Sequence, residues 1–380
     1  SESLIPVSGR VYPDPQTISE ISRLIKAAKR PLIVGGRGAM LSNAGPECET
    51  LAEKIGALLV TTLPARGLFV NSPFSLNITG GFASDTAREA CNDADLVIAV
   101  GTSLASHSTD SGRLYKNAKI LHIDLVPRIY SQGRVAAHFH IRADAKVGIK
   151  SLIESLNEKV MVKRDTIYWR DSLISKQANA KYPDNITFSP ESGFLDPRKV
   201  IKKLDEIIPK DWFMVNSSGH CSYYAAHMFG RSANNFLTIR EFGAIGNGLS
   251  YAVGAAVARP NQQIVLIDGD GGFLMHAQEL ETLQRHGIKL LIIVLNDRAF
   301  GSEIHKLRAD NHDENGACFG KTDIASIARG FGLEGKCFRD LADLDMALEE
   351  FKDSKLGALW DFQISDKIMS PVMRRLTGLA

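Results

Sequence analysis

Residues 262–301 read QQIVLIDGDGGFLMHAQELETLQRHGIKLLIIVLNDRAFG. One apolar run ends at Asp270, which is enclosed by glycines, and a second apolar run ends at Asn296. The segment between the runs has room for one helix, and a strand–helix–strand unit usually takes about 30 residues. Parallel strands joined in this way end at the same edge of the sheet. We therefore expect the side chains of Asp270 and Asn296 to face one crevice.

The residue types at these two strand ends indicate the ligand. Both side chains offer oxygen, and oxygen is the ligand that Mg²⁺ prefers. Gly269, Gly271 and Gly272 carry no Cβ atom, so backbone N–H groups can approach an anion there. A helix expected from about His276 would add its positive N-terminal end. The pattern predicts bound Mg²⁺ and a diphosphate. The matching Asn296 disfavours the alternative, a glycine-rich turn with an N-capping Asp.

The remainder of the chain repeats this alternation of strands and helices. Short apolar runs that end in Gly or a polar residue are typical of buried parallel strands. Such runs lie at 31–34, 58–62, 95–100, 119–124, 212–215, 236–239, 264–267, 290–295 and 359–363. Helical patterns in the second half lie at 198–208, 248–258, 277–286, 324–331 and 341–352.

These patterns predict an α/β protein with two open parallel-sheet domains that carry helices on both faces. The first domain, at 1–155, is expected to be Rossmann-like. A polar stretch at 156–190 is expected to be a linker with a short helix. The second domain, at 191–380, begins with an N-capping Asp followed by Pro.

Composition excludes several classes of protein. The chain has 380 residues, 44% hydrophobic and 23% charged, with a net charge of +2, so neither nucleic acid nor a membrane is an expected partner. Five cysteines without a C-x-x-C pair favour a reducing compartment, the cytoplasm, over zinc or disulfides. No apolar run approaches the roughly 18 residues of a membrane span. The first residue is Ser and no signal peptide follows, so we expect a processed chain or a piece of a longer one.

Three segments together resemble the thiamine diphosphate-dependent enzymes, in particular the acetolactate synthase-like decarboxylases and carboligases. The segment GDGGFLMHAQELETLQRHGIKLLIIVLN (269–296) is similar to the family signature, in which G-D-G is followed at a distance by N. The other two segments are NSSGHCSYYAAHMF (216–229) and REFGAIGNGLSYAVGAAVARP (240–260). By this resemblance the first domain is the family's central domain, and the second is its thiamine diphosphate-binding domain.

The resemblance implies specific roles for residues of the second domain. Mg²⁺ would be bound by the side chains of Asp270 and Asn296 and by the main-chain carbonyl of Arg298. Ile245 would lie beneath the cofactor and force it into a bent shape, and Ile245 and His220 are the implied catalytic residues. The residues implied to contact the cofactor also include Gly219, His220, Gly243, Ala244, Gly269, Gly271, Gly272, Phe300 and Gly301.

Two departures from the family shape the expected activity. Asp297 stands where many members have a second Asn, and no segment corresponds to the N-terminal pyrimidine-binding domain with its catalytic Glu. The resemblance therefore implies a partner chain that carries this Glu, in a homo- or hetero-oligomer that acts on a small 2-oxo acid. The implied reaction is decarboxylation with carboligation, dependent on thiamine diphosphate and Mg²⁺. The alternatives are a simple 2-oxo acid decarboxylase and a non-catalytic cofactor-binding or regulatory subunit.

The first domain carries a partial dinucleotide-binding pattern. GGRGAM (35–40) ends one predicted strand and Asp124 ends another, but the third Gly of G-x-G-x-x-G is absent. The segment GTSLASHSTDSGR (101–113) also differs from the R-F-D-D-R-like segment of the family's flavin-binding synthases. FAD or another nucleotide in this domain is therefore not favoured, and neither is an NAD- or FAD-dependent oxidoreductase or a deoxyhypusine synthase-like or sirtuin-like enzyme. Glu303 and His305 are further candidates for substrate contact, against an ordinary exposed helix face.

Overall fold

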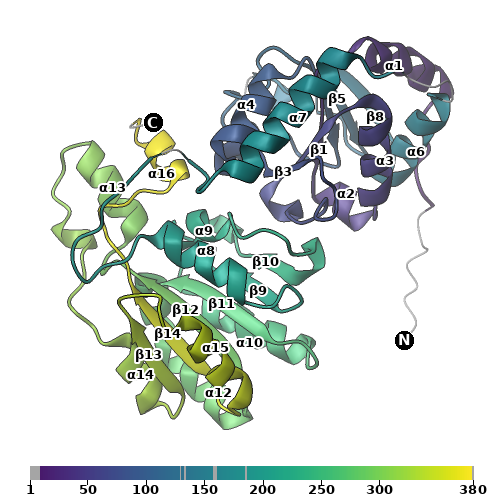
Figure 1. Ribbon diagram of the computed structural model, residues 1–380. Coiled ribbons are helices and arrows are strands. Elements are labelled where there is room, and N and C mark those ends of the chain that lie inside the picture. The colour runs from purple at the N-terminus through teal and green to yellow at the C-terminus, as the bar shows by residue number, and fades with distance from the viewer. Residues whose placement is uncertain (1–8, 129, 132–133, 157–160, 185, 379–380) are drawn as a thin grey trace. The chain divides into compact units, whose positions relative to one another are not determined.

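The computed structural model describes residues 9–128, 130–131, 134–156, 161–184 and 186–378 (Figure 1). The chain divides into two compact units, Ser1–Pro183 and Asp184–Ala380. Each unit contains a six-stranded sheet in which every strand pair is parallel. Helices surround both sheets. The prediction of an α/β protein with two open parallel-sheet domains is confirmed.

The first unit has the strand order β3-β2-β1-β4-β5-β8. These strands are β1 (Pro31–Gly35), β2 (Leu58–Thr61), β3 (Ser75–Ile78), β4 (Leu96–Val100), β5 (Lys119–Asp124) and β8 (Phe139–Arg142). The helices are α1 (Pro15–Ala27), α2 (Arg37–Leu41), α3 (Gly45–Ile55), α4 (Asp85–Asp93), α5 (Ser106–Thr109), α6 (Ala145–Ser155) and α7 (Arg164–Asn179), with 3-10 turns η1 (Leu63–Ala65) and η2 (Gly80–Phe82). A small antiparallel pair, β6 (Tyr130–Ser131) and β7 (Arg134–Val135), lies outside the sheet.

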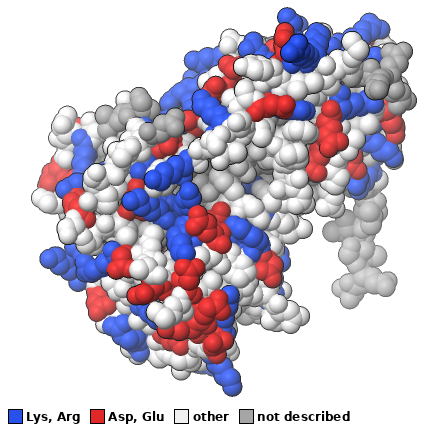
Figure 2. All heavy atoms as spheres, viewed as in Figure 1, with Lys and Arg blue, Asp and Glu red and all other residues white. Residues whose placement is uncertain are grey.

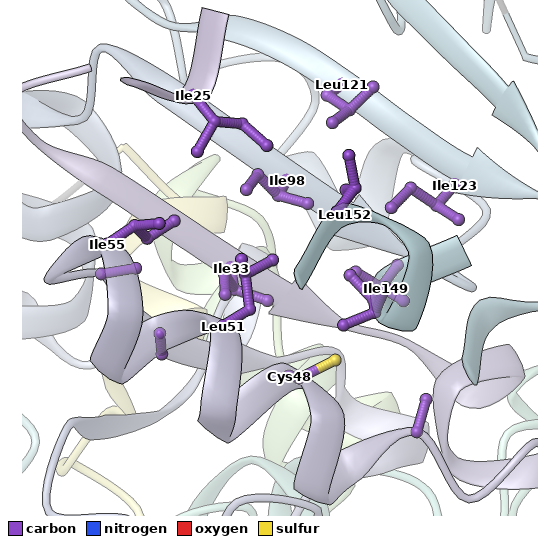
Figure 3. Packing of buried hydrophobic residues seen from close by; sticks show 14 of the residues in the cluster. Ile25, Ile33, Cys48, Leu51, Ile55, Ile98, Leu121, Ile123, Ile149 and Leu152 are labelled. Atoms are coloured by element: carbon purple, nitrogen blue, oxygen red, sulfur yellow. The ribbon is translucent and has the colours of Figure 1, made fainter. Parts of the chain in front are cut away.

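Both faces of this first sheet are packed, because successive side chains of a strand point to opposite faces. On one face, Ile33 of β1, Ile98 of β4 and Leu121 of β5 pack with Leu51 of α3 and Leu152 of α6 (Figure 3). A second cluster covers the other face with the alternate residues of the same strands. Burial on two faces explains why the strands read as continuous apolar runs in the sequence.

The second unit has the strand order β10-β9-β11-β12-β14-β13. Its strands are β9 (Phe213–Asn216), β10 (Phe236–Thr238), β11 (Ile264–Gly269), β12 (Leu290–Asn296), β13 (Glu334–Phe338) and β14 (Ala358–Gln363). The helices are α8 (Pro197–Ile207), α9 (His220–Ala225), α10 (Gly248–Ala258), α11 (Asp270–Leu274), α12 (Leu280–His286), α13 (Gly301–Ala309), α14 (Ile324–Gly330), α15 (Leu344–Asp353) and α16 (Pro371–Leu376). The 3-10 turns are η3 (Ala233–Asn235), η4 (Glu241–Gly243), η5 (Ala277–Glu279) and η6 (Asn315–Ala317). Here too a buried apolar cluster lies on each face of the sheet.

Within the two six-stranded sheets, the sequence analysis missed three strands: β3, β8 and β13. All three lie at the edges of their sheets, where fewer side chains are buried. Their sequences, SLNI, FHIR and EGKCF, mix buried with exposed positions, so none forms a continuous apolar run. An edge strand therefore lacks the signal by which the central strands were found.

The stretch predicted as a linker contains a 16-residue helix, α7. Trp169 and Leu173 of α7 are buried in the second core cluster of the first unit, and the boundary between the units falls at Pro183 and Asp184. The first unit therefore extends past the predicted boundary at residue 155. Residues 157–160 and 185 of the predicted linker lie outside the described residues.

Two surface properties bear on possible partners. Within the part of the chain that the structure describes, no helix is both long and apolar enough to cross a membrane. On the face drawn in Figure 2, basic and acidic side chains are interspersed over both units.

The carboxyl edge of the first sheet is closed by backbone packing. The N–H groups of Gly36 and Gly38 donate to the carbonyls of Val100 and Gly101, both at 2.8 Å. A Cβ atom on Gly36 would lie 2.3 Å from the Gly101 oxygen, so this approach requires glycine. The GGRG turn thus uses two of the N–H groups that a nucleotide phosphate would need.

A pair of histidines, one buried and one half-buried, lies near the same edge. His122 of β5 is fully buried and its Nε2 donates to the Thr102 carbonyl at 2.9 Å. The ring of His140, from the neighbouring strand β8, lies 5.2 Å away between centroids. Burial lowers the pKa of His122 below its usual range, although the Thr102 carbonyl and Asp124 partly oppose this shift.

This burial predicts an acid-sensitive fold. Because the folded state keeps His122 neutral, the unfolded chain binds the proton more readily. The stabilisation is therefore fully present above the unfolded pKa of about 6.5 and is lost as the pH falls below it. We expect His122→Gln to flatten the pH dependence of urea unfolding between about pH 8 and 5, by at most about 1.4 kcal/mol per pH unit for one proton. His286→Gln, at an exposed position, is the control. A wild-type slope in His122→Gln would contradict this account.

Candidate cofactor site

The site lies where β11 and β12 end. The two strands pair in parallel, with Gly269 opposite Leu295, so Asp270 and the Asn296–Asp297 pair leave the same edge of the sheet. Helix α11, which the sequence analysis did not expect, begins at Asp270 directly after the strand. The helix expected from about His276 is present as η5 and α12.

Two carboxyl groups face each other at this edge. Asp270 is buried, and the Asp297 carboxyl lies within its hydrogen-bonding reach. Burial, followed by the nearby Asp297 charge, raises the pKa of Asp270 well above the usual range. Burial also raises the pKa of Asp297. Asp297 is half-buried by its exposed area. Two acids at one point, one buried and one half-buried, are costly when both are ionised and unpartnered, so the arrangement favours a bound cation.

The side chain of Asn296 points elsewhere. Its Nδ2 donates to Asp361 Oδ1 at 2.9 Å, and its Oδ1 accepts from the Arg298 N–H at 3.2 Å. The Arg298 carbonyl, expected as a metal ligand, accepts a hydrogen bond from the Phe319 N–H at 2.6 Å. The structure thus brings Asp297, rather than Asn296, to Asp270.

Asp297 was missed as a site residue because the sequence presents two polar residues in a row at the strand end. Successive residues of a strand point to opposite faces, so only one of the two can face Asp270. Asn296 pairs in register with Gln363 of β14, and Gln363 also hydrogen-bonds to Asp361. This polar network on β14 occupies Asn296, and it is formed by residues far away in the sequence.

The glycines of the β11–α11 turn have different packing roles. A Cβ atom on Gly271 would lie 2.7 Å from the ring of Phe300, and one on Gly272 would lie 2.7 Å from Asp268 Oδ1. Gly269, in contrast, has only ordinary contacts. Gly271 therefore lets Phe300 pack against the turn, and Gly272 leaves room for a buried carboxyl.

That carboxyl, Asp268, is a second acid that the sequence analysis did not single out. It is almost fully buried, and burial raises its pKa to about 7, although Ser217 and the Gly269 N–H oppose the shift. A Cβ atom on Gly248, the first residue of α10, would lie 2.5 Å from Asp268 Oδ2. The acid therefore packs against the start of α10 and accepts a hydrogen bond from Gly269 in the β11–α11 turn. Its only sequence signal was the doubled Asp of IDGD.

His220 approaches the carboxyl pair from α9. A Cβ atom on Gly301 would lie 2.1 Å from Asp297 Oδ2 and 3.1 Å from His220 Nδ1, so both atoms face one point beside Gly301. His220 is buried, and burial, with a contribution from His305, lowers its pKa well below the usual range. His220 is thus a neutral imidazole beside the two acids.

His305 lies against His220. The two ring centroids are 4.9 Å apart and the rings are nearly perpendicular. His305 is buried and its Nε2 has no hydrogen-bond partner within the described residues. Burial, followed by the nearby charge of Arg308, lowers the pKa of His305 to about 4. Glu303, the other candidate of this segment, is exposed and pairs with Lys306 at 2.9 Å, as an ordinary helix face would.

The loop before α10 carries Ile245. A Cβ atom on Gly219 would lie 3.6 Å from Ile245 Cγ2, so Ile245 faces the turn that precedes His220. The loop contains three residues with positive φ, namely Phe242, Gly243 and Gly246. Gly243 and Ala244 are exposed, and no atom lies within 4 Å of a Cβ placed on Gly243. Among the residues predicted to contact the cofactor, Gly243 and Ala244 are thus placed on the exposed part of this loop.

Within the described residues, no group of three or more His, Cys, Asp or Glu side chains is arranged to hold a metal ion. The carboxyl pair therefore offers two protein ligands of this kind, which suits a cation that takes its other ligands from phosphate and water.

Comparison with known proteins places this geometry in a family. Residues 217–361 match the thiamine pyrophosphate enzyme C-terminal TPP binding domain, and residues 18–152 match the thiamine pyrophosphate enzyme central domain. The chain belongs to the acetolactate synthase-like family of thiamine diphosphate-dependent enzymes. The second unit is therefore the family's thiamine diphosphate-binding domain, and its match covers His220, Ile245 and the carboxyl pair.

The proteins to which this chain is similar have more than one name. A probable acetolactate synthase large subunit of Methanococcus aeolicus is 27% identical, over 96% of this chain and 63% of the relative. A 3D-(3,5/4)-trihydroxycyclohexane-1,2-dione hydrolase of Geobacillus thermodenitrificans is 28% identical, over 95% of this chain and 61% of the relative. Acetolactate synthase 2, chloroplastic, of Nicotiana tabacum is 31% identical, over 76% of this chain and 43% of the relative. The chain spans about three-fifths of the length of the first two.

Proposed function

We propose that this chain forms the diphosphate- and Mg²⁺-binding part of an enzyme that decarboxylates a 2-oxo acid and joins the remaining acyl unit to a carbonyl acceptor. The observation that carries the proposal is the pair of facing carboxyls at the ends of β11 and β12, in a chain of the thiamine diphosphate-dependent family.

Mg²⁺ would be held by Asp270 and Asp297. The pair fits a divalent cation, because a double positive charge favours the ionised form of both acids and removes their mutual repulsion. Asn296 would act indirectly, since its hydrogen bonds to Asp361 and Arg298 hold the loop that presents Asp297. This assignment replaces Asn296 by Asp297 as the second side-chain ligand.

The diphosphate would lie between the β11–α11 turn and His220. The N–H groups of Gly271 and Gly272 are the proposed donors on one side, and Gly219 and His220 are those on the other. His220 suits this role, because a neutral imidazole N–H can donate to an anion without the cost of burying a cation.

Ile245 would support the rest of the cofactor. Its side chain faces the Gly219 turn, where an apolar body can press on the cofactor and keep it bent. The bound cofactor supplies the electron sink that decarboxylation of a 2-oxo acid requires. The role of the chain is to orient the cofactor and its diphosphate and to exclude water.

The site needs a further polypeptide segment. We propose that a pyrimidine-binding domain with the catalytic Glu is supplied by a partner chain, in a homo- or hetero-oligomer. In support, the family matches cover the central and C-terminal domains. Roughly two-fifths of each of the two relatives lies outside the part that aligns with this chain. Carboligation is favoured over simple decarboxylation by the relatives named acetolactate synthase. The cytoplasmic location stays a prediction.

The metal assignment predicts an order among three variants. Asp270→Ala and Asp297→Ala should each abolish Mg²⁺-dependent binding of thiamine diphosphate in calorimetric titration, because each removes a charged ligand. Asn296→Ala should weaken binding by no more than about tenfold, as expected for loss of a supporting hydrogen bond. The opposite order, in which Asn296→Ala binds no thiamine diphosphate and Asp297→Ala binds it as the wild type does, would support Asn296 as the ligand.

Ile245→Ala should separate binding from turnover. We expect the variant to bind Mg²⁺ and cofactor normally but to have a lower kcat on pyruvate with the partner present, because the cofactor can relax from its bent form. Val257→Ala, at an exposed position of α10, should match the wild type. Unchanged kcat in Ile245→Ala would reject the proposed support.

The first test of the function is native mass spectrometry of the chain purified from its source, with thiamine diphosphate and Mg²⁺ added. We expect a complex that holds the cofactor and a second polypeptide, and decarboxylation of pyruvate by that complex. A chain that binds cofactor with a partner but never turns over would instead be a regulatory subunit. A chain that binds no cofactor in any complex would contradict the proposal.

A further inference from the structure

Four charged side chains lie buried together in the second unit. They are Asp184, Asp196, Arg198 and Arg374, each with its side chain at most 10% exposed. Arg198 Nη2 lies 2.7 Å from Asp196 and its Nη1 lies 2.9 Å from Asp184 Oδ1. Arg374 Nη2 lies 2.8 Å from Asp184 Oδ2. Asp184 therefore joins two arginines, one from α8 and one from α16.

This network fixes the C-terminal helix to the beginning of the unit. Removing one partner from a buried ion pair leaves an uncompensated charge, so the position of α16 is strongly specified. The segment that leads into α16 is held at two further points. The Tyr224 hydroxyl donates to the Ile368 carbonyl, and the N–H of Ser370 donates to His220 Nε2 at 3.3 Å.

The Ser370 bond decides where His220 carries its proton. A neutral imidazole has one donor and one acceptor nitrogen. Because Nε2 accepts from a backbone N–H, the proton lies on Nδ1. That nitrogen is the one beside Gly301 and Asp297, on the side where the diphosphate is proposed to bind.

We propose that Asp184, Arg198 and Arg374 form a positioning network for His220. By fixing the segment before α16, the network keeps the Ser370 N–H on Nε2 and so presents an Nδ1–H donor to the cofactor diphosphate. The last step rests on the proposed function, whereas the tautomer is a property of the chain alone. Arg374 and Asp184 are positioning residues, since they act on the site only through Ser370 and His220.

Two residues of the network can be separated from general packing. Ser370 has φ −65° and ψ 157°, which proline adopts without strain. Ser370→Pro therefore removes the N–H donor and the capping hydroxyl, whereas Ser370→Ala removes only the hydroxyl, which accepts from Met373 N at 3.1 Å. Because the proline ring Cδ would lie where the N–H now points at His220 Nε2, Ser370→Pro shifts the imidazole as well as removing the donor. Arg374→Met, which leaves Ser370 and His220 unsubstituted, is therefore the second test of the same bond.

The experiment is nitrogen NMR of the protein labelled with ¹⁵N-histidine, without cofactor, with the His220 signals assigned through His220→Gln. We expect wild type and Ser370→Ala to show a protonated Nδ1 and an unprotonated Nε2. In Ser370→Pro and Arg374→Met the two tautomers should interconvert. Arg285→Met removes an exposed arginine of an ion pair on α12 and should leave the spectrum unchanged.

A second readout connects the tautomer to binding. Titration with thiamine diphosphate and Mg²⁺ should give an affinity up to about tenfold weaker in Ser370→Pro than in Ser370→Ala, the value of one hydrogen bond. If the wild type shows the expected tautomer but binds no cofactor, the proposed function fails and the positioning network stands.

Two results would overturn the network itself. One is a wild-type His220 with its proton on Nε2. The other is a folded Arg374→Met variant, checked by circular dichroism, that keeps the wild-type tautomer. If Arg374→Met does not fold, Asp184→Asn replaces it, because this variant keeps the shape of the side chain while removing its charge. Its ¹⁵N-histidine spectrum is then compared with that of the wild type, and an unchanged His220 tautomer overturns the network.

Discussion

The parallel pairing of β11 with β12 is the constraint on which the site depends. It sets the ends of both strands at one edge of the sheet, and it thereby brings two acids, the buried Asp270 and the half-buried Asp297, face to face. Acids at this distance cannot both ionise at low cost without a cation or strong hydrogen bonds. The charge requirement of the site thus follows directly from sheet geometry, and the surrounding residues serve to maintain that geometry.

Several of those residues act from outside the site. Asp361 and Gln363 on β14 engage Asn296 and so determine which residue of the Asn–Asp pair faces Asp270. Asp268 lies beneath the turn, where glycines at 248 and 272 leave space for it. The segment before α16 approaches His220 from 150 positions further along the chain. Residues of β14 and of the segment before α16, both far from the β11–α11 turn in the sequence, therefore converge with it on one imidazole and one carboxyl pair.

The first unit illustrates the limits of motif reading. Its GGRG turn resembles part of a dinucleotide fingerprint, yet Gly36 is required there by the close approach of the Gly101 backbone. The N–H groups of the turn are paired with carbonyls of the protein itself. A glycine-rich turn after a strand can therefore reflect strand-to-loop packing alone, and a ligand needs separate evidence such as the facing acids of the second unit.

Local sequence was sufficient for most of the fold. Central strands such as β4, β5 and β12 were predictable because burial on both faces produces an uninterrupted apolar run. The edge strands were not, because their partly exposed residues carry no such run. In the site, local motifs predicted Asp270, His220, Ile245 and Asn296, but they could not show whether Asn296 or Asp297 faces Asp270. That choice depends on strand register and on Asp361, which lies 65 positions away in the chain. The hydrogen bond from Ser370 to His220 spans 150 positions. Contacts of this range are formed only when the sheet and α16 have packed, because no local pattern encodes which distant group will meet a given side chain.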